Sequence, residues 1–430
     1  MIKRQKGCND IFGREAKIWK YVDSVIDAVM EKYNYTYIRT PIFEATELFH
    51  RGVGETTDIV TKESYDFIDK GGRNITLRPE GTAGVVRAYI ENKMYGDANQ
   101  PIKVYYNGTM YRYERPQSGR DRELTQFGVE VLGTDDPMSD AEVISLAVNV
   151  YRMLGLKEIK VNINSLGDDE SRGAYREALV EYFKPHIDEL CEDCKARLEK
   201  NPLRILDCKV DAENEIMKKA PKTLDYLNDE SRDRFEKVCD YLEVLGVKYE
   251  INPSIVRGLD YYTKTVFEFV ADSIGAQGTV CGGGRYDGLI EELGGQHTPS
   301  LGFAMGLERL QLVMEAQGCE FPEPSRPDLF IVAMGDKATL KAVEIAKDMR
   351  DEGYSVVYDL NGRSLRAQMK YADKINAKYN VVIGDNEVDT KSAVLKDMAT
   401  GEQSDISLET FVSGFYSITL DSQLKDLEIN

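Results

Sequence analysis

The sequence predicts an α+β protein built as an antiparallel-sheet domain with a helical insert, followed by a small α/β domain. Two β-rich runs, residues 102–113 and 123–132, flank a polar loop that contains proline and glycine, which is typical of a hairpin and favours antiparallel pairing. Charged sequence with helical spacing fills residues 168–249, and strands alternate with helices after residue 328. A chain of 430 residues also exceeds the size of one ordinary core.

The first domain is predicted to span residues 1–320. It begins with a helix at residues 14–33, and the β-rich hairpin follows. Its helical insert, about residues 169–249, shows apolar spacing near 3.6 around residues 175–183 and 235–245.

Three prolines within residues 318–328 can continue neither a helix nor a sheet, so the domain boundary is predicted there. The second domain, residues 327–430, is expected to hold a largely parallel sheet. Its predicted elements are strand 329–333, helix 337–351, strand 355–360, helix 364–375 and strand 379–383.

Charge and hydropathy narrow the class of protein. No run of 18 apolar residues and no apolar signal segment occurs, so a cytoplasmic protein outside the membrane is expected. The net charge of −19 argues at first against nucleic acid, although only the contacting face must be basic. Two basic clusters could form such a face or be solvated surfaces: Arg112, Arg115, Arg120 and Arg122; and Arg363, Arg366, Lys370, Lys374 and Lys378.

Seven cysteines in a long chain without a secretory signal predict reduced thiols. Cys191, Cys194 and Cys208 could hold a tetrahedral zinc, with His186 or Cys239 as a fourth ligand. The second half of a paired Cys-x-x-Cys ribbon is missing. Thiols within a helical insert are therefore the preferred interpretation, and no metal site is predicted.

Two segments could hold phosphate. Arg112 and Glu114 are expected to close the first strand of the hairpin, where residues two apart share a face. Arg309 is expected in the first turns of a helix that follows a glycine-containing strand, at residues 302–310. An exposed ion pair and a packed strand-to-helix junction are the alternative interpretations.

In this order, Arg112-x-Glu114 and Gly306-x-x-Arg309 resemble motifs 2 and 3 of class II aminoacyl-tRNA synthetases. Residues 37–48, with a proline after a strand, resemble motif 1, which is a dimer-interface element. The resemblance implies a class II catalytic domain.

Five further blocks resemble those of the histidyl-tRNA synthetases: residues 77–82, 114–120, 126–130, 281–288 and the heptapeptide 257–263, Arg-Gly-Leu-Asp-Tyr-Tyr-Thr. The resemblance covers the chain from about residue 7 to the end, including an anticodon-binding-like C-terminal domain. Residues 121–125, Asp-Arg-Glu-Leu-Thr, depart from the family, which usually has an aromatic and an Arg-Gln-Phe-like run there. This departure places an extra acid in the loop expected to meet tRNA.

The resemblance implies ATP-dependent activation of L-histidine to histidyl-adenylate and transfer to the 3′ end of tRNA(His), by a homodimer that uses Mg²⁺. The implied catalytic residues are Arg257 and Arg112, and the implied ATP-binding residues are Arg112, Glu114 and Arg309. The implied histidine-binding residues are Glu80, Thr82, Gln126, Glu130, Tyr261 and Tyr262, and the implied tRNA contacts are Gln117 and Arg120.

Two rival functions share part of this pattern. A regulatory subunit of histidine biosynthesis would bind histidine without charging tRNA, but such paralogues typically lose the C-terminal domain and the ATP arginines. A class II synthetase for threonine, proline or glycine would lack the heptapeptide and the 281–288 block. Class I synthetases and P-loop ATPases are disfavoured because their motifs are absent from the sequence.

Overall fold

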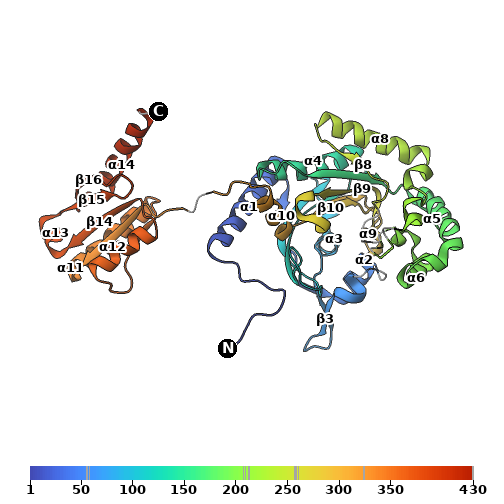
Figure 1. The fold of residues 1–430 in the computed structure, drawn as a ribbon, viewed down its shortest axis with the longest axis horizontal. Helices are drawn as coiled ribbons and strands as arrows, with labels where there is room; N and C mark the ends of the chain where they lie inside the picture. The colour runs from blue at the N-terminus through green and yellow to red at the C-terminus, as the bar shows by residue number, and fades with distance from the viewer. Residues whose placement is uncertain are drawn as a thin grey trace. The chain divides into compact units, whose positions relative to one another are not determined.

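The computed structural model divides the chain into two compact units, Met1–Pro322 and Glu323–Asn430, which are described separately (Figure 1). None of the described helices is both long enough and apolar enough to cross a membrane. The predicted domain limits, 1–320 and 327–430, stay a prediction. The structure describes residues 1–54, 57, 59–206, 208, 210–211, 214–255, 259, 261–322 and 325–428.

An eight-stranded sheet forms the centre of the first unit, and its six inner strands pair antiparallel. The two short outermost strands pair parallel to their neighbours. The predicted α+β class with an antiparallel sheet is confirmed. The strands, in spatial order, are β1 (Thr36–Tyr37), β5 (Ile102–Tyr111), β6 (Glu123–Leu132), β11 (Ser300–Gly306), β10 (Thr279–Arg285), β9 (Thr263–Val270), β7 (Lys160–Ser165) and β8 (Glu250–Ile251).

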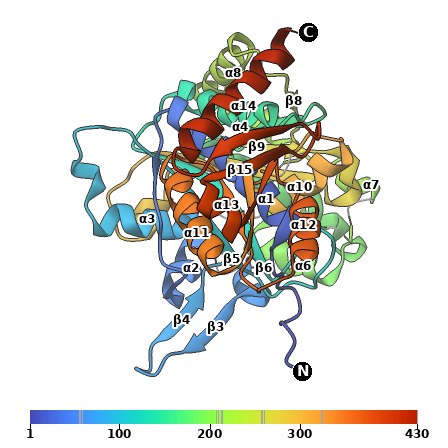
Figure 2. The same cartoon turned by 90° about the vertical axis from the view of Figure 1, so that its left-hand side faces the viewer.

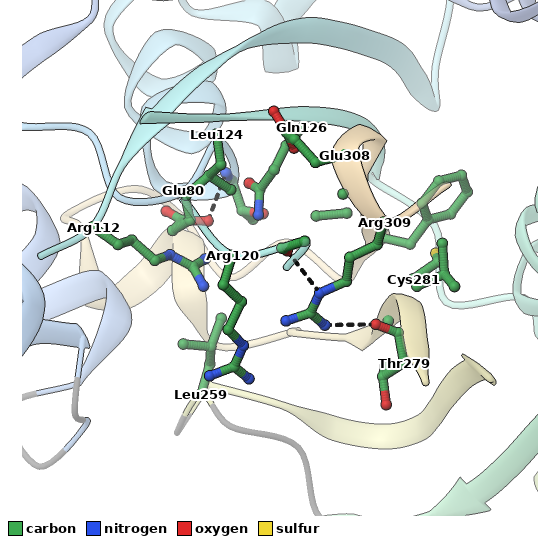
Figure 3. A pocket seen from close by; sticks show the side chains of 18 of the residues that line it. Glu80, Arg112, Arg120, Leu124, Gln126, Leu259, Thr279, Cys281, Glu308 and Arg309 are labelled. Atoms are coloured by element: carbon green, nitrogen blue, oxygen red, sulfur yellow. Dashed lines mark hydrogen bonds between the residues drawn. The ribbon is translucent and has the colours of Figure 1, made fainter. Parts of the chain in front are cut away.

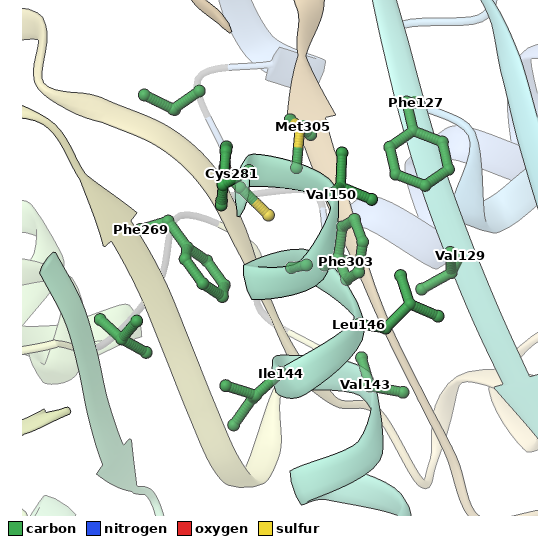
Figure 4. Packing of buried hydrophobic residues seen from close by; sticks show 14 of the residues in the cluster. Phe127, Val129, Val143, Ile144, Leu146, Val150, Phe269, Cys281, Phe303 and Met305 are labelled. Atoms are coloured by element: carbon green, nitrogen blue, oxygen red, sulfur yellow. The ribbon is translucent and has the colours of Figure 1, made fainter. Parts of the chain in front are cut away.

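Helix α4 (Pro137–Met153) lies across one face of this sheet, where its apolar side chains meet those of the strands (Figure 4). Asp136 caps the helix by accepting a hydrogen bond from the Met138 N–H. Helices α1 (Gly13–Lys32) and α10 (Leu307–Ala316) contribute to the same core. This face is therefore fully occupied by packing, and a ligand must use the other face.

Shorter elements cover part of the opposite face. Helices α3 (Thr82–Glu91) and α9 (Leu289–Glu292) share a second core with side chains of the sheet. Helix α2 (Thr46–Val53) packs beside α3. A small antiparallel sheet joins β2 (Phe43–Ala45), β4 (Asn74–Leu77) and β3 (Tyr65–Ile68).

In the described part of the chain between β7 and β8 lie four α-helices: α5 (Asp169–Phe183), α6 (Glu192–Lys200), α7 (Glu215–Lys218) and α8 (Asp229–Val244). They do not form one body. Helix α8 packs its apolar face into the main core, whereas α5, α6 and α7 enclose a small core of their own. In Figure 1, α5 and α6 lie at the edge of the first unit.

The second unit is a five-stranded sheet of β13 (Val356–Tyr358), β12 (Leu329–Met334), β14 (Tyr379–Gly384), β15 (Ser392–Asp397) and β16 (Gln403–Ser407). Along β12, alternate side chains enter two separate cores, so helices cover both faces. The helices are α11 (Asp336–Asp351), α12 (Leu365–Lys374), α13 (Asp385–Thr390) and α14 (Phe411–Glu428), and Figure 2 shows them around the sheet.

The prediction of a largely parallel second sheet was only partly correct. Strands β13, β12 and β14 are parallel, but β15 and β16 add an antiparallel hairpin. In β15 and β16 only Ala393, Leu395 and Ile406 are buried, and most of the other residues are polar, so their apolar signal is weak. The prediction therefore followed the alternation of strands and helices that precedes them in the sequence.

Candidate active site

The face of the large sheet opposite α4 carries a pocket (Figure 3). Strand alternation explains its position on β6, because Phe127 and Val129 enter the core beneath α4 while Gln126 and Glu130 belong to the other face. Nine of the predicted site residues line it: Glu80, Thr82, Arg112, Glu114, Arg120, Gln126, Tyr261, Tyr262 and Arg309.

Small residues of β11 leave the space for this pocket. Gly302, Phe303, Ala304 and Gly306 line it, and Phe303 and Met305 also belong to the core beneath α4. A Cβ on Gly302 would lie 2.0 Å from Glu130 Oε2 and 2.3 Å from the Val129 carbonyl oxygen, so no side chain fits there. The glycine permits β11 and β6 to pair directly beside the buried carboxylate.

Three arginines direct their guanidinium groups toward one space (Figure 3). The Arg309 Nη1 donates to the Thr279 carbonyl at 2.7 Å, and its Nε donates to the Gly119 carbonyl at 3.3 Å. The Arg112 Nε donates to the Pro79 carbonyl at 2.8 Å. Backbone acceptors thus fix two of the cations, while Arg120 Nη1 pairs with Glu114 at 3.1 Å. Such a group of fixed cations is suited to a polyphosphate.

The prediction that Arg112 and Glu114 share a strand face was wrong. Strand β5 ends at Tyr111, and the Glu114 N–H donates to the Arg112 carbonyl at 2.8 Å, which turns the chain away from the ladder. The turn still brings the Arg112 Nη1 within 4.0 Å of Glu114 Oε1. Both side chains line the pocket because of the turn and not because of strand alternation.

Glu80 and Glu130 form the buried acidic part of the site. Glu80 accepts hydrogen bonds from the N–H groups of Thr82 and Ala83, at 2.7 and 2.8 Å, and so satisfies two of the free N–H groups at the start of α3. Glu130 is fully buried and does not line the pocket itself. It accepts hydrogen bonds from the hydroxyls of Thr82, at 2.8 Å, and Tyr286. Burial raises the pKa of both carboxyls, that of Glu130 to about 8.

Aromatic side chains form the wall of the pocket beside these acids. The rings of Tyr261 and Tyr262 lie 4.8 Å apart, and those of Tyr261 and Tyr286 lie 5.6 Å apart in an edge-to-face arrangement. Tyr286 was not predicted as a site residue, although it stands in the 281–288 block. Arg257, the predicted catalytic arginine of the heptapeptide, lies outside the described residues.

Gln126 offers an unmet acceptor to the pocket. Its side chain is buried, and its Oε1 accepts no hydrogen bond from the part of the chain that the structure describes. An unsatisfied buried carbonyl is unfavourable by about 1 to 3 kcal/mol. A ligand N–H donor would remove that penalty.

The loop between β5 and β6 is held by a tight turn and by the N-terminal segment. Gln117 and Arg120 exchange backbone hydrogen bonds of 3.0 and 2.9 Å, which forms an isolated bridge. The extra acid Asp121 accepts a hydrogen bond from the Asn9 side chain at 2.8 Å. Arg120 lines the pocket, whereas Gln117 is outside it.

Glu308 is a pocket residue that the sequence analysis missed. It is the second residue of α10, and its carboxyl accepts a hydrogen bond from the Thr125 N–H of β6 at 2.7 Å. Burial raises its pKa to about 7. Its place beside Arg309 was the available signal, but a charged residue at a helix start usually faces solvent.

Glu308 should make stability depend on pH. Its pKa is about 7 when folded and 4.5 in the reference state, so the folded chain retains a proton that the unfolded chain has lost. The stabilising contribution is complete below the unfolded pKa and is lost as the pH rises through about 7, by up to about 3 kcal/mol. We expect the apparent melting temperature to fall less between pH 5 and pH 8 in Glu308→Gln than in the parent. Glu315→Gln is the control. If the apparent melting temperature fell equally between pH 5 and pH 8 in Glu315→Gln and in Glu308→Gln, the prediction would be contradicted.

Two family models together match most of the chain. Residues 7–310 match the family described as Histidyl-tRNA synthetase, and residues 328–417 match the Anticodon binding domain. The chain is 54% identical over 410 residues to a histidine–tRNA ligase of Anoxybacillus flavithermus, which covers 95% of this chain and 97% of that protein. It is 55% identical over 413 residues to one of Acetivibrio thermocellus, with coverage of 96% and 99%.

Solved structures of similar fold include histidyl-tRNA synthetases. The apo histidyl-tRNA synthetase of S. aureus superposes with a TM-score of 0.84 at 45% identity, covering 96% of this chain and 100% of that chain. A protein of Bacillus halodurans C described as an ATP phosphoribosyltransferase regulatory subunit/histidyl-tRNA synthetase superposes with a TM-score of 0.63 at 23% identity. It covers 89% of this chain and 98% of its own, and this likeness shows the fold alone.

Proposed function

Since the chain belongs to the histidyl-tRNA synthetase family and charges tRNA with histidine in an ATP-dependent reaction, we propose that the pocket of Figure 3 is where histidine and ATP react. The observation that carries this proposal is the meeting of three arginines with a buried acidic and aromatic recess in one pocket. The recess is the proposed histidine site, and the arginine side is the proposed ATP site.

The first step joins two anions, because the histidine carboxylate attacks the α-phosphate of ATP. An oxygen of the α-carboxylate of histidine forms the new bond to the α-phosphorus, and the bond from that phosphorus to pyrophosphate breaks. Fixed cations reduce the repulsion without reorganising, so positioning and charge neutralisation dominate the catalysis. We assign Arg112 to the α-phosphate and Arg309 to the γ-phosphate, and both are held in advance by backbone carbonyls.

Mg²⁺ would accompany the polyphosphate, since it prefers oxygen ligands and keeps several waters. Glu114 fits this requirement as a carboxylate that lines the pocket between Arg112 and Arg120. Glu308 fits it less well because its carboxyl holds the Thr125 N–H and has a raised pKa. When bound, the ion would neutralise phosphate charge, and Glu114 would orient it or the adenine.

Histidine recognition requires groups that read both ring nitrogens. A site built on buried hydrogen bonds rejects a side chain that cannot make them, whereas an apolar pocket discriminates weakly. We assign Glu130 and Tyr262 to the imidazole and Tyr261 to the pocket wall. Glu130 would act from behind the lining, through the hydroxyls of Thr82 and Tyr286 that it holds at the pocket. Glu80, Thr82 and the unmet acceptor of Gln126 would hold the α-amino and carboxylate groups.

The transfer step places the 3′ end of tRNA(His) beside the loop between β5 and β6. We assign Gln117 and Arg120 to this contact. In the second unit, Arg366, Lys370 and Lys374 are spaced four apart on α12, so they share one helix face. Arg363 and Lys378 of the same basic cluster instead pair with Asp359 and Asp328, at 2.5 and 2.8 Å. The α12 face is the proposed phosphate contact of the second unit.

Gln117→Ala should separate the two steps. Loss of one hydrogen bond to the tRNA end should slow the transfer by about fivefold, because such a bond contributes about 1 kcal/mol. Histidine-dependent ATP–pyrophosphate exchange should stay unchanged, since Gln117 is outside the pocket. Single-turnover transfer from preformed histidyl-adenylate measures the first quantity. If exchange slows as much as transfer, the assignment to tRNA is wrong.

The homodimer and the cytoplasmic location stay predictions. The segment that resembles motif 1 exposes Tyr37, Ile42 and Phe43, at 54%, 40% and 59% of their full surface. Neighbouring exposed aromatic and aliphatic groups are typical of a protein–protein interface, and a second copy of this chain is the proposed partner. Sedimentation velocity reports the oligomeric state directly.

One experiment tests the function against its rivals. The purified chain should exchange pyrophosphate into ATP only with histidine and should charge tRNA(His). Exchange with threonine, proline or glycine would indicate another class II synthetase. Histidine binding without adenylate formation would indicate a regulatory subunit. Charging of tRNA(His) with and without its extra 5′ guanosine tests tRNA choice in the same assay.

A further inference from the structure

Four potential metal ligands converge in the small core of the insert, away from the pocket. The sulfur atoms of Cys191, Cys194 and Cys208 and a carboxylate oxygen of Asp211 all lie within 4.8 Å of one another. We propose that these four residues form a closed structural site for Zn²⁺. This differs from the sequence prediction, which preferred thiols without a metal.

Two of the distances between ligand atoms are close to the edges of a zinc tetrahedron. With Zn–S bonds of about 2.3 Å and Zn–O bonds of about 2.0 Å, two sulfur ligands lie about 3.8 Å apart and a sulfur and an oxygen about 3.5 Å apart. The Sγ atoms of Cys191 and Cys208 are separated by 3.7 Å. The Cys208 Sγ lies 3.6 Å from Asp211 Oδ2. A disulfide would instead require about 2.05 Å between the sulfurs.

Short helical segments position the three cysteines. Cys191 is the N-cap residue of α6, and Cys194 follows in its first turn, so the start of this helix brings the two cysteines together. Cys208 closes the turn after Pro202–Ile205, with its N–H donating to the Ile205 carbonyl at 3.0 Å.

Further N–H groups support the ligand atoms. The Asp211 N–H donates to the Cys208 sulfur at 3.5 Å, and the Cys191 N–H donates to Asp211 Oδ2 at 3.1 Å. Outer contacts of this kind orient the ligands of metal sites.

Neither of the two fourth ligands that the sequence suggested belongs to this converging group. The His186 Nδ1 lies 2.7 Å from Glu189, and Cys239, on α8, packs against the main core instead. Asp211 takes the place because it is only 8% exposed and pairs with none of the cations that the structure describes. A divalent cation would supply this carboxylate with a counter-charge.

A metal would compensate for the small size of this core. The helices around it, α6 and α7, have 9 and 4 residues, which is short for helices that fold by themselves. Small bodies of this kind are commonly stabilised by a metal or by disulfides. Thiolate ligands favour Zn²⁺ over Mg²⁺ or Ca²⁺. On binding, the three thiols release their protons to solvent and coordinate as thiolates.

The test measures metal on the full chain. Protein purified without chelators and dialysed should carry about one zinc ion per chain by atomic emission. Cys191→Ser and Cys208→Ser should lose most of that zinc. Asp211→Asn, which removes the charge and keeps the shape, should retain it more weakly against a competing chelator. Cys239→Ser, a change at the other insert thiol, should keep the parent content.

A second measurement avoids variants that fail to fold. Co²⁺ exchanged into the parent chain should show thiolate-to-cobalt charge transfer and the d–d bands of a tetrahedral site. A parent chain that holds no zinc after growth in zinc-supplemented medium would overturn the proposal. So would Cys191→Ser protein with the full zinc content, or a Co²⁺ spectrum without sulfur ligation. A Cys191–Cys208 disulfide in the protein as purified would also overturn it.

Discussion

Replacing Arg309 with alanine should slow histidine-dependent ATP–pyrophosphate exchange by about 10²- to 10³-fold, the usual effect of removing one fixed donor to transition-state charge. The guanidinium is held by the carbonyls of Thr279 and Gly119, and its burial together with the neighbouring Arg120 lowers its pKa. A cation that has lost water in this way gains strongly from an arriving phosphate. The loss should therefore appear in kcat and in the KM for ATP, and not in the KM for histidine.

Two matched variants separate charge from packing. Arg309→Lys keeps the charge and loses the two-pronged geometry, so its activity should be intermediate. Gln311→Ala, on the same helix and bonded to Glu315, should behave like the parent. An Arg309→Ala protein with an unchanged exchange rate would show that this arginine only fastens α10 to the loop. The melting temperature of each variant shows whether the fold is intact.

Replacing Glu130 with glutamine should lower kcat/KM for histidine by about 10- to 100-fold, with little change in the KM for ATP. The carboxyl accepts hydrogen bonds from Thr82 and Tyr286, and each hydrogen bond of this kind contributes about 0.5 to 1.5 kcal/mol. The amide cannot accept on both atoms, so its NH₂ would face a hydroxyl donor or the imidazole N–H. Glu142→Gln, at a partly exposed acid that pairs with Lys103, is the control.

The pH dependence of stability tests the role of Glu130 independently. The pKa of Glu130 rises to about 8 on folding, so its stabilising effect is complete below the unfolded pKa of 4.5 and is lost as the pH rises through 8. Glu130→Gln lacks this titration. As the pH is raised, the apparent melting temperature of the parent should therefore fall more than that of Glu130→Gln. A constant difference between the two proteins would contradict the buried, raised-pKa carboxyl.

Local patterns were sufficient for much of the fold. The hairpin of β5 and β6 and the junction of β11 with α10 follow from strand period and from small residues before an amphipathic helix. The end of β5 was not predictable, because the Glu114 to Arg112 backbone bond that turns the chain has no proline or glycine at its centre.

The site was predictable where residues belong to motifs and not where tertiary packing decides. Glu308 and Asp211 are ordinary acids in the sequence, and only the fold buries one against Thr125 and places the other beside three thiols. The converse holds for Arg257. The heptapeptide predicts its catalytic role, but it lies outside the described residues, so that role stays a prediction.

The close approach at Gly302 bears on how related sequences should be interpreted. Two neighbours exclude a side chain at this position, and one of them, the Val129 carbonyl, is part of the backbone and would remain whatever residue replaced Glu130. Evolution toward a different amino-acid substrate could therefore exchange Glu130 while position 302 stayed fixed. Invariance of this glycine among distant relatives would report the spacing of two strands, and it should not be counted as evidence for a shared substrate.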